Sequence, residues 1–120
     1  MTRSDLRPYD PDSLPAAVVR YLGAQDQPRD RASVLVEFAA DARVTDEGIR
    51  YDGTEAIRGW LGTVASAYTY TTTLIGQQHT GADRWEVLAR LEGDFPGGVA
   101  ELRYRFTMRD DTIAELVIAP

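Results

Sequence analysis

The chain has 120 residues, of which 43% are hydrophobic and 27% charged, with one histidine, no cysteine and a formal charge of −6 at pH 7. A chain of this length forms one domain with a sizeable core, and the absence of cysteine excludes disulfides and thiol catalysis. The acidic balance, with no cluster of Lys and Arg, argues against binding to a nucleic acid backbone.

The apolar runs are only a few residues long, too short for a transmembrane helix, and the polar N-terminus does not resemble a secretory signal. With no cysteine as well, we expect a cytoplasmic protein without a membrane partner. A zinc site is not expected, because a single histidine would leave most of the ligands to carboxylates.

Residues 1–12 are polar and contain two prolines, so we expect an extended N-terminal arm before a single domain at residues 13–120. Asp12 or Ser13 can cap a first helix, which Gly23 ends. The apolar face of this helix consists of residues at helical spacing, Leu14, Val18, Tyr21 and Leu22. The tyrosine of this set is therefore predicted on the buried side.

Two further helices flank a short hairpin. A second helix is predicted from Asp30, with its apolar face formed by Val34, Leu35, Phe38 and Ala39. Residues 41–46 then alternate with a period of two, which is typical of a strand, and the turn at 47–48 leads into a return strand at 49–51. Thr54 can cap a third helix, whose core stripe is formed by Ile57, Trp60, Leu61 and Val64.

The remainder of the chain has the pattern of four long strands, at residues 68–80, 85–93, 99–108 and 112–120. Their turns are short, so neighbouring strands are antiparallel, and long strands of this kind curl. A curled sheet with helices on one face leaves a concave, mostly apolar hollow, which is the default place for a small molecule to bind.

Alternation assigns side chains to the two faces of the sheet. The apolar face of the second and third long strands includes Trp85, Val87, Leu91, Leu102 and Tyr104. The opposite face carries Glu101, Arg103 and Arg105, and we expect it to be solvated or to face a second subunit.

His79 is the only histidine, and its orientation depends on the turn that follows it. With two loop residues in the turn, His79 faces away from the Trp85 side of the sheet; with three, it faces the pocket. We expect the outward orientation.

The element order, together with FAADARVTDEG (residues 38–48) followed by YDGTEAIRGWL (residues 51–61), resembles the NTF2-like superfamily, in its SnoaL-like and ketosteroid-isomerase-like branch. The resemblance covers about residues 10–119, nearly the whole chain. It implies a cone-shaped α+β fold, with three N-terminal helices packed on a strongly curved, mainly antiparallel sheet around a pocket. It also implies a homodimer through the outer sheet face, and no cofactor.

Residue by residue, the same resemblance implies a catalytic set. Asp46 falls on the base of the ketosteroid isomerase pattern, and Tyr21 falls on the tyrosine of its oxyanion hole. The protonated aspartate of that pattern is absent, and Tyr104 stands in its place. The implied substrate is a small, largely apolar carbonyl compound.

Each of these residues also has a structural interpretation. Asp46 is either a general acid or base whose pKa an apolar cup raises, or a strand-end carboxylate bonded to the next turn. The Tyr21 hydroxyl needs a partner, which a ligand or a backbone carbonyl can supply. Pocket wall and plain core are both open for six apolar residues, Phe38, Trp60, Trp85, Val87, Leu102 and Leu116.

Three functions remain open at this point. The chain is a cofactor-independent isomerase, lyase or cyclase that uses Asp46, Tyr21 and Tyr104; a non-catalytic pocket for an apolar ligand; or a dimeric interaction module whose cavity is vestigial.

Overall fold

A computed structural model describes residues 6–65 and 67–120. Within these residues the strands are β1 (Arg7–Pro8), β2 (Phe38–Asp46), β3 (Ile49–Asp52), β4 (Tyr70–Gly81), β5 (Arg84–Gly93), β6 (Val99–Arg109) and β7 (Thr112–Ala119). The α-helices are α1 (Ala16–Gly23), α2 (Pro28–Arg31) and α3 (Gly53–Gly62), and two 3₁₀ helices are η2 (Pro11–Ser13) and η3 (Ala32–Glu37).

The described strands form one mixed sheet in the order β1-β4-β5-β6-β7-β2-β3. All neighbours are antiparallel except β2 and β7, which pair in parallel. The predicted turn between β2 and β3 is confirmed: Glu47 and Gly48 both have positive φ, at 52° and 78°, which suits the twist of a two-residue hairpin loop. The sheet is therefore mainly antiparallel, as its short turns require.

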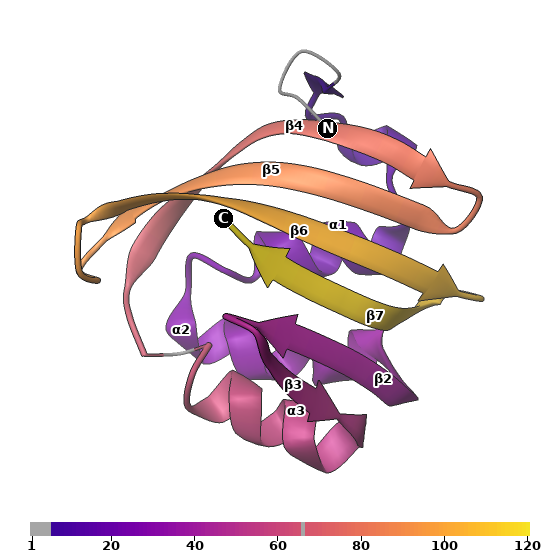
Figure 1. Cartoon of the computed structure of the whole chain (residues 1–120), viewed down its shortest axis with the longest axis horizontal. Helices are drawn as coiled ribbons and strands as arrows, with labels where there is room; N and C mark the ends of the chain where they lie inside the picture. Colours follow the sequence, from indigo (N-terminus) through magenta and orange to yellow (C-terminus); the bar gives the residue numbers. More distant parts are fainter. Residues whose placement is uncertain (1–5, 66) are drawn as a thin grey trace.

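Figure 1 shows β4 to β7 arching as one curved layer, with α1 under its concave side and α3 against the β2–β3 hairpin. The core fills the space between that concave side and the helices. All four residues of the predicted apolar face of the first helix are buried in it. The fold is thus an α+β cone, and its core holds Tyr21 of α1 on the concave side of the sheet.

The first and third helices begin at other residues than predicted. Asp10, not Asp12 or Ser13, is the capping side chain, and it caps η2; α1 starts only after Pro15. In α3 the N-cap is Asp52, and Thr54 instead donates its hydroxyl to the Ala40 carbonyl. The cause is that more than one short polar side chain at each site can accept or donate locally.

The second predicted helix is mostly not α-helical. The α-helical part ends at Arg31, η3 continues to Glu37, and β2 starts at Phe38 instead of at residue 41. Phe38 pairs with Ile113 of β7, so strand pairing over a long sequence distance overrides the helical spacing of the apolar residues. Val64, predicted on the core stripe of the third helix, lies beyond its end and is 46% exposed.

No helix among residues 6–65 and 67–120 combines the length and the apolar character that crossing a membrane requires.

The start of β4 approaches β5 unusually closely at Gly93, the partner of Tyr70 in the register. A Cβ atom on Gly93 would lie 2.2 Å from the Thr69 carbonyl oxygen and 2.6 Å from the Tyr70 Cβ. Backbone does not give way as a flexible side chain does, so this position requires glycine.

Gly93→Ala is expected to lower the free energy of unfolding by about 1–3 kcal/mol, because the added methyl overpacks the β4–β5 pair. The matched control is Gly59→Ala in α3, where a Cβ meets nothing within 4 Å, and a gain of about 0.5–1 kcal/mol is expected from helix propensity. Urea unfolding of both variants measures the difference. Equal effects of the two substitutions would contradict the close approach.

Candidate functional site

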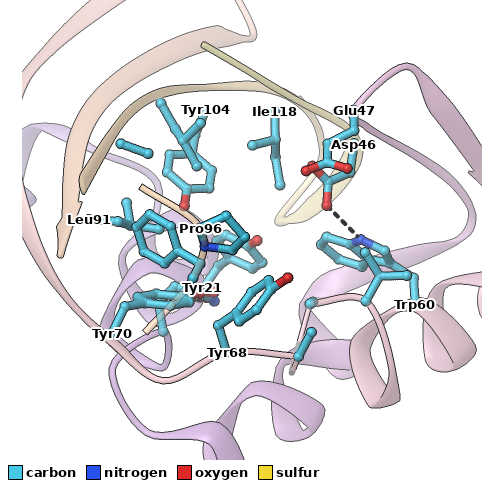
Figure 2. A pocket seen from close by; sticks show the side chains of 17 residues that line it. Tyr21, Asp46, Glu47, Trp60, Tyr68, Tyr70, Leu91, Pro96, Tyr104 and Ile118 are labelled. Carbon is cyan, nitrogen blue, oxygen red and sulfur yellow. Dashed lines mark hydrogen bonds between the residues drawn. The ribbon is translucent and has the colours of Figure 1, made fainter. Parts of the chain in front are cut away.

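A cavity of about 620 Å³ opens between the concave side of the sheet and the helices (Figure 2). Its lining comes from α1 and the residues after it, the end of β2 and the β2–β3 turn, α3, the loop between α3 and β4, the loop between β5 and β6, and residues of β4 to β7. The lining residues are Tyr21, Gln25, Asp46, Glu47, Trp60, Val64, Ala65, Ala67, Tyr68, Tyr70, Leu91, Phe95, Pro96, Ala100, Leu102, Tyr104 and Ile118.

The sheet register places two of the predicted catalytic residues in one row. Asp46 on β2 lies opposite Ile118 on β7, which in turn lies opposite Tyr104 on β6. Residues opposite one another point to the same face, so Asp46 and Tyr104 both face the cavity. Two strand spacings separate their backbones by about 10 Å, which leaves room for a ligand between the side chains.

Asp46 is a half-buried carboxylate at the mouth of the cavity. Its Oδ2 accepts a hydrogen bond from Trp60 Nε1 at 3.1 Å (Figure 2). Burial raises the pKa of Asp46, the Trp60 hydrogen bond opposes this rise, and the neighbouring charge of Glu47 adds to it. A carboxyl group with a raised pKa, open to a cavity, can both accept and return a proton.

Tyr21 and Tyr104 are phenols buried in the core, at 1% and 3% exposure, and their ring centroids are 6.2 Å apart. Figure 2 shows the Tyr104 hydroxyl pointing into the cavity. Neither hydroxyl donates a hydrogen bond to any residue that the structure describes. Burial raises the pKa of both phenols, so they stay protonated and can donate to a ligand oxygen.

Three of the six predicted wall residues lie in the core below the cavity. Trp60 and Leu102 line the cavity, whereas Phe38, Val87 and Leu116 are buried without lining it. The side chains do point inward as alternation predicts, but the narrow end of the cone is filled by packing. Only the open end of each strand therefore contributes to the cavity.

Trp85 and His79 lie in a different hollow, beside β1. His79 is opposite Trp85 in the β4–β5 register, and the two rings stack with centroids 3.9 Å apart and an angle of 6°. The outward orientation expected for His79 is therefore wrong: it shares the face of Trp85, because a register shift follows it in β4. Neither ring reaches the cavity.

Sequence patterns did not predict the part of the lining around Tyr70. Its hydroxyl donates to Gln25 Oε1 at 3.3 Å, and Gln25 Nε2 donates to the Tyr21 carbonyl at 2.8 Å. Tyr68 and Phe95 come from loops, for which periodicity carries no signal. Only the alternation in residues 68–80 could have placed the Tyr70 ring on the inner face.

The described ranges contain no group of three or more His, Asp or Glu side chains that could hold a metal ion. The arrangement offers instead a carboxylate on one side and neutral phenol donors on the other. Such a pair can move a proton next to a polarised carbonyl.

No protein-family model matches the sequence, and no curated protein is significantly similar to it. Several solved structures, however, are similar to this chain. A proposed polyketide cyclase from Sinorhizobium meliloti is 34% identical, with a TM-score of 0.81; the match covers 92% of this chain and 100% of that one.

Two more distant structures share the fold. The Δ5-3-ketosteroid isomerase of a Mycobacterium species is 18% identical, with a TM-score of 0.70, and the match covers 88% of this chain and 90% of that one. A protein from Catenulispora acidiphila with a ketosteroid-isomerase-like fold, in complex with trimethylamine, is 19% identical with a TM-score of 0.74; the match covers 90% of this chain and 87% of that one.

Asp46→Asn is expected to raise the free energy of unfolding at pH 7, because a neutral amide avoids the cost of partly burying a charge. Because the pKa of Asp46 is raised on folding, the protonated acid stabilises the folded wild type relative to the unfolded chain. This stabilisation is complete below the unfolded pKa and is lost as pH rises through the folded pKa. The advantage of the variant should therefore vanish below about pH 3.8, the ordinary aspartate pKa that Asp46 has in the unfolded chain. Urea unfolding of both proteins at pH values from about 3.5 to about 8, which span the titration of an aspartate with a raised pKa, measures the difference in their free energies of unfolding.

Asp41→Asn is the control for this prediction. A hydrogen bond from Arg109 lowers the pKa of Asp41, which is exposed. Its ionised form therefore stabilises the folded chain above the unfolded pKa, and removing the charge should give no gain at pH 7. A gain for Asp41→Asn as large as that for Asp46→Asn would contradict the assigned burial of Asp46.

Proposed function

Since this chain belongs to the NTF2-like superfamily, whose SnoaL-like and ketosteroid-isomerase-like members include its structural neighbours, we propose that it acts on a small, largely apolar carbonyl compound inside the cone. Asp46 is the general base and acid, and Tyr21 and Tyr104 stabilise the oxyanion. The reaction is an isomerisation, elimination or cyclisation, and it requires no cofactor.

One observation carries this proposal: a half-buried carboxylate and two phenols, whose hydroxyls donate to no described residue, share one aromatic cavity. Asp46 would remove a proton from the carbon next to the carbonyl, and negative charge would develop on the carbonyl oxygen. The two phenol O–H groups would donate to that oxygen in a site largely closed to water. Return of the proton to another carbon completes an isomerisation.

The neighbours support small-molecule binding in such a cone. One is named as a ketosteroid isomerase and another holds trimethylamine. The 34% identical neighbour is named as a proposed polyketide cyclase, and cyclisation also begins with removal of a proton beside a carbonyl. The proposal therefore keeps the reaction class broad and the acid–base residue specific.

The second candidate is a non-catalytic pocket for an apolar ligand. It is favoured by the lining itself: among the lining residues that the structure describes, the only charged side chains are Asp46 and Glu47, and most of the others are aromatic or aliphatic. In this case ligand affinity would not need the acid. The two candidates separate on whether bound compounds are converted.

A homodimer through the outer sheet face stays a prediction of the resemblance. That face carries Glu86, which is buried and lies 3.6 Å from both Arg103 and Arg105. Size-exclusion chromatography with light scattering would test it.

Asp46→Asn is expected to lower turnover by about 10²–10⁴-fold, the usual contribution of a general base. Probe reactions are the conversion of a Δ5-3-ketosteroid to its conjugated isomer, followed by absorbance, and exchange of α-protons of cyclic ketones in D₂O, followed by NMR. Wild-type activity should fall as pH drops through the pKa of Asp46, since the base must be ionised. Burial places this fall above the ordinary aspartate value of 3.8.

Asp41→Asn provides the matched control, since it makes the same change at an exposed aspartate outside the cavity. It should retain wild-type turnover and the same pH profile. If Asp46→Asn also converted the probes at the wild-type rate, Asp46 would not be the base. If neither the wild type nor Asp46→Asn converted any probe, while both bound the probes equally, the non-catalytic binding function would be supported instead.

Tyr104→Phe and Tyr21→Phe are each expected to lower turnover by about 10²-fold, the usual effect of removing one oxyanion donor. The free energy of unfolding should change by less than about 1 kcal/mol, because neither hydroxyl donates a hydrogen bond within the described chain. Tyr51→Phe is the control, since Tyr51 packs near Trp60 without lining the cavity. Equal activity of all three variants would remove both phenols from the mechanism.

A further inference from the structure

Arg31, the last residue of α2, is wholly buried directly behind one wall of the cavity. Its Nε donates to the Gln25 carbonyl at 2.7 Å, and its Nη1 donates to the carbonyls of Ala65 and Tyr68 at 3.1 and 2.7 Å. The guanidinium carbon lies 4.2 Å from the centroid of the Tyr70 ring. Arg31 does not line the cavity, but all four of these contacts do.

This buried cation has no counterion among the described residues. No ion pair of that part of the chain includes Arg31, and its Nη2 is buried without a hydrogen-bond acceptor. A buried charge is costly unless something of opposite sign compensates it. Carbonyl dipoles and one aromatic face give Arg31 only part of that compensation.

The charges around the cavity are unevenly placed. Figure 2 shows Asp46 and Glu47 on one side of the cavity and Tyr70 and Tyr104 on the other. Arg31 contacts the Tyr70 side. A ligand in the cavity therefore meets negative charge at one end and a hidden positive charge behind the other.

The phenols respond to this positive charge. Burial raises the pKa of Tyr21, Tyr70 and Tyr104, and the Arg31 guanidinium opposes the rise in all three. Asp46 acts on the same phenols in the opposite sense, and Asp26 does so on Tyr70 and Tyr104. Asp26 is exposed, so water screens its charge more than that of the buried guanidinium.

We propose that Arg31 is a positioning residue that makes the Tyr70–Tyr104 end of the cavity selective for ligands bearing or developing negative charge, such as enolates, phenolates and carboxylates. The inference rests on the proposed function for its site but concerns charge selection, which binding measures without turnover. It also fixes the orientation of a carbonyl substrate: the oxygen lies at the Tyr70–Tyr104 end, where the Tyr104 hydroxyl can donate to it, and the acidic C–H lies toward Asp46.

Isothermal titration with three ligands of one shape tests the proposal: naphthalene-2-carboxylate, the neutral naphthalene-2-carboxamide and the cationic 2-naphthylmethylammonium. Arg31→Gln is expected to weaken carboxylate binding, relative to carboxamide binding, on the order of tenfold, as expected for a charge acting through a partly screened interior. Arg31→Lys keeps the charge and should restore most of the preference. A preference unchanged in Arg31→Gln would overturn the proposal.

Arg58→Gln is the matched control, because it removes the same charge from an exposed arginine of α3 that pairs with Glu55. Its ratio of carboxylate to carboxamide affinity should stay within about twofold of wild type, the change expected for a screened surface charge. An equal loss of the ratio in Arg58→Gln and Arg31→Gln would overturn the proposal, since net charge alone would then explain it.

The wild-type protein gives a second measurement that needs no folded Arg31→Gln. It should bind carboxylate more tightly than carboxamide, and carboxamide more tightly than ammonium, and Asp46→Asn should strengthen carboxylate binding further. Tightest binding of the ammonium ligand would overturn the proposal. Loss of turnover plays no part in this order, so an inactive protein with the expected order would refute the proposed reaction and keep the role of Arg31.

Discussion

The parallel pairing of β2 with β7 is the constraint on which the rest of the molecule depends. It joins the N-terminal half of the chain to the curved meander formed by β4 to β7, and it brings the end of β2 into the same row as β6. Without this register, Asp46 would end a hairpin remote from the phenols. One long-range strand pairing thus creates both the closed cone and the meeting of acid and phenols within it.

The cavity holds polar groups under conditions that a purely structural core avoids. Asp46 has a raised pKa although Trp60 donates a hydrogen bond to it, and the buried Arg31 guanidinium is compensated only by backbone carbonyls and the face of the Tyr70 ring. Each arrangement costs stability that an aliphatic side chain would not. Proteins keep such groups where a site must stabilise charge that appears only during binding or reaction, and these two stand at different walls of the same hollow.

Much of the fold follows from local pattern, and the site follows from it only in part. The turn at Glu47–Gly48, the strand alternation and the inward face of Tyr21 were predicted because short-range chemistry decides them. The 3₁₀ segment before Phe38 was missed because strand pairing with β7 overrides helical spacing. The Arg31 hydrogen bonds were missed because they join residues up to 37 positions apart, and their acceptors lie outside the helices and strands, where periodicity carries no signal.

Gly93 has a consequence for how this cavity can change. The backbone before β4 lies so close to Gly93 that there is no room for even a methyl group between them. This contact fixes the spacing of β4 and β5 beside the cavity. The cavity therefore cannot adapt to a larger ligand through single substitutions that move these two strands apart. Such a change must come from smaller or larger side chains in the lining. Substitutions of Tyr68, Phe95 and Leu102 are therefore the ones that would alter the width of the cavity.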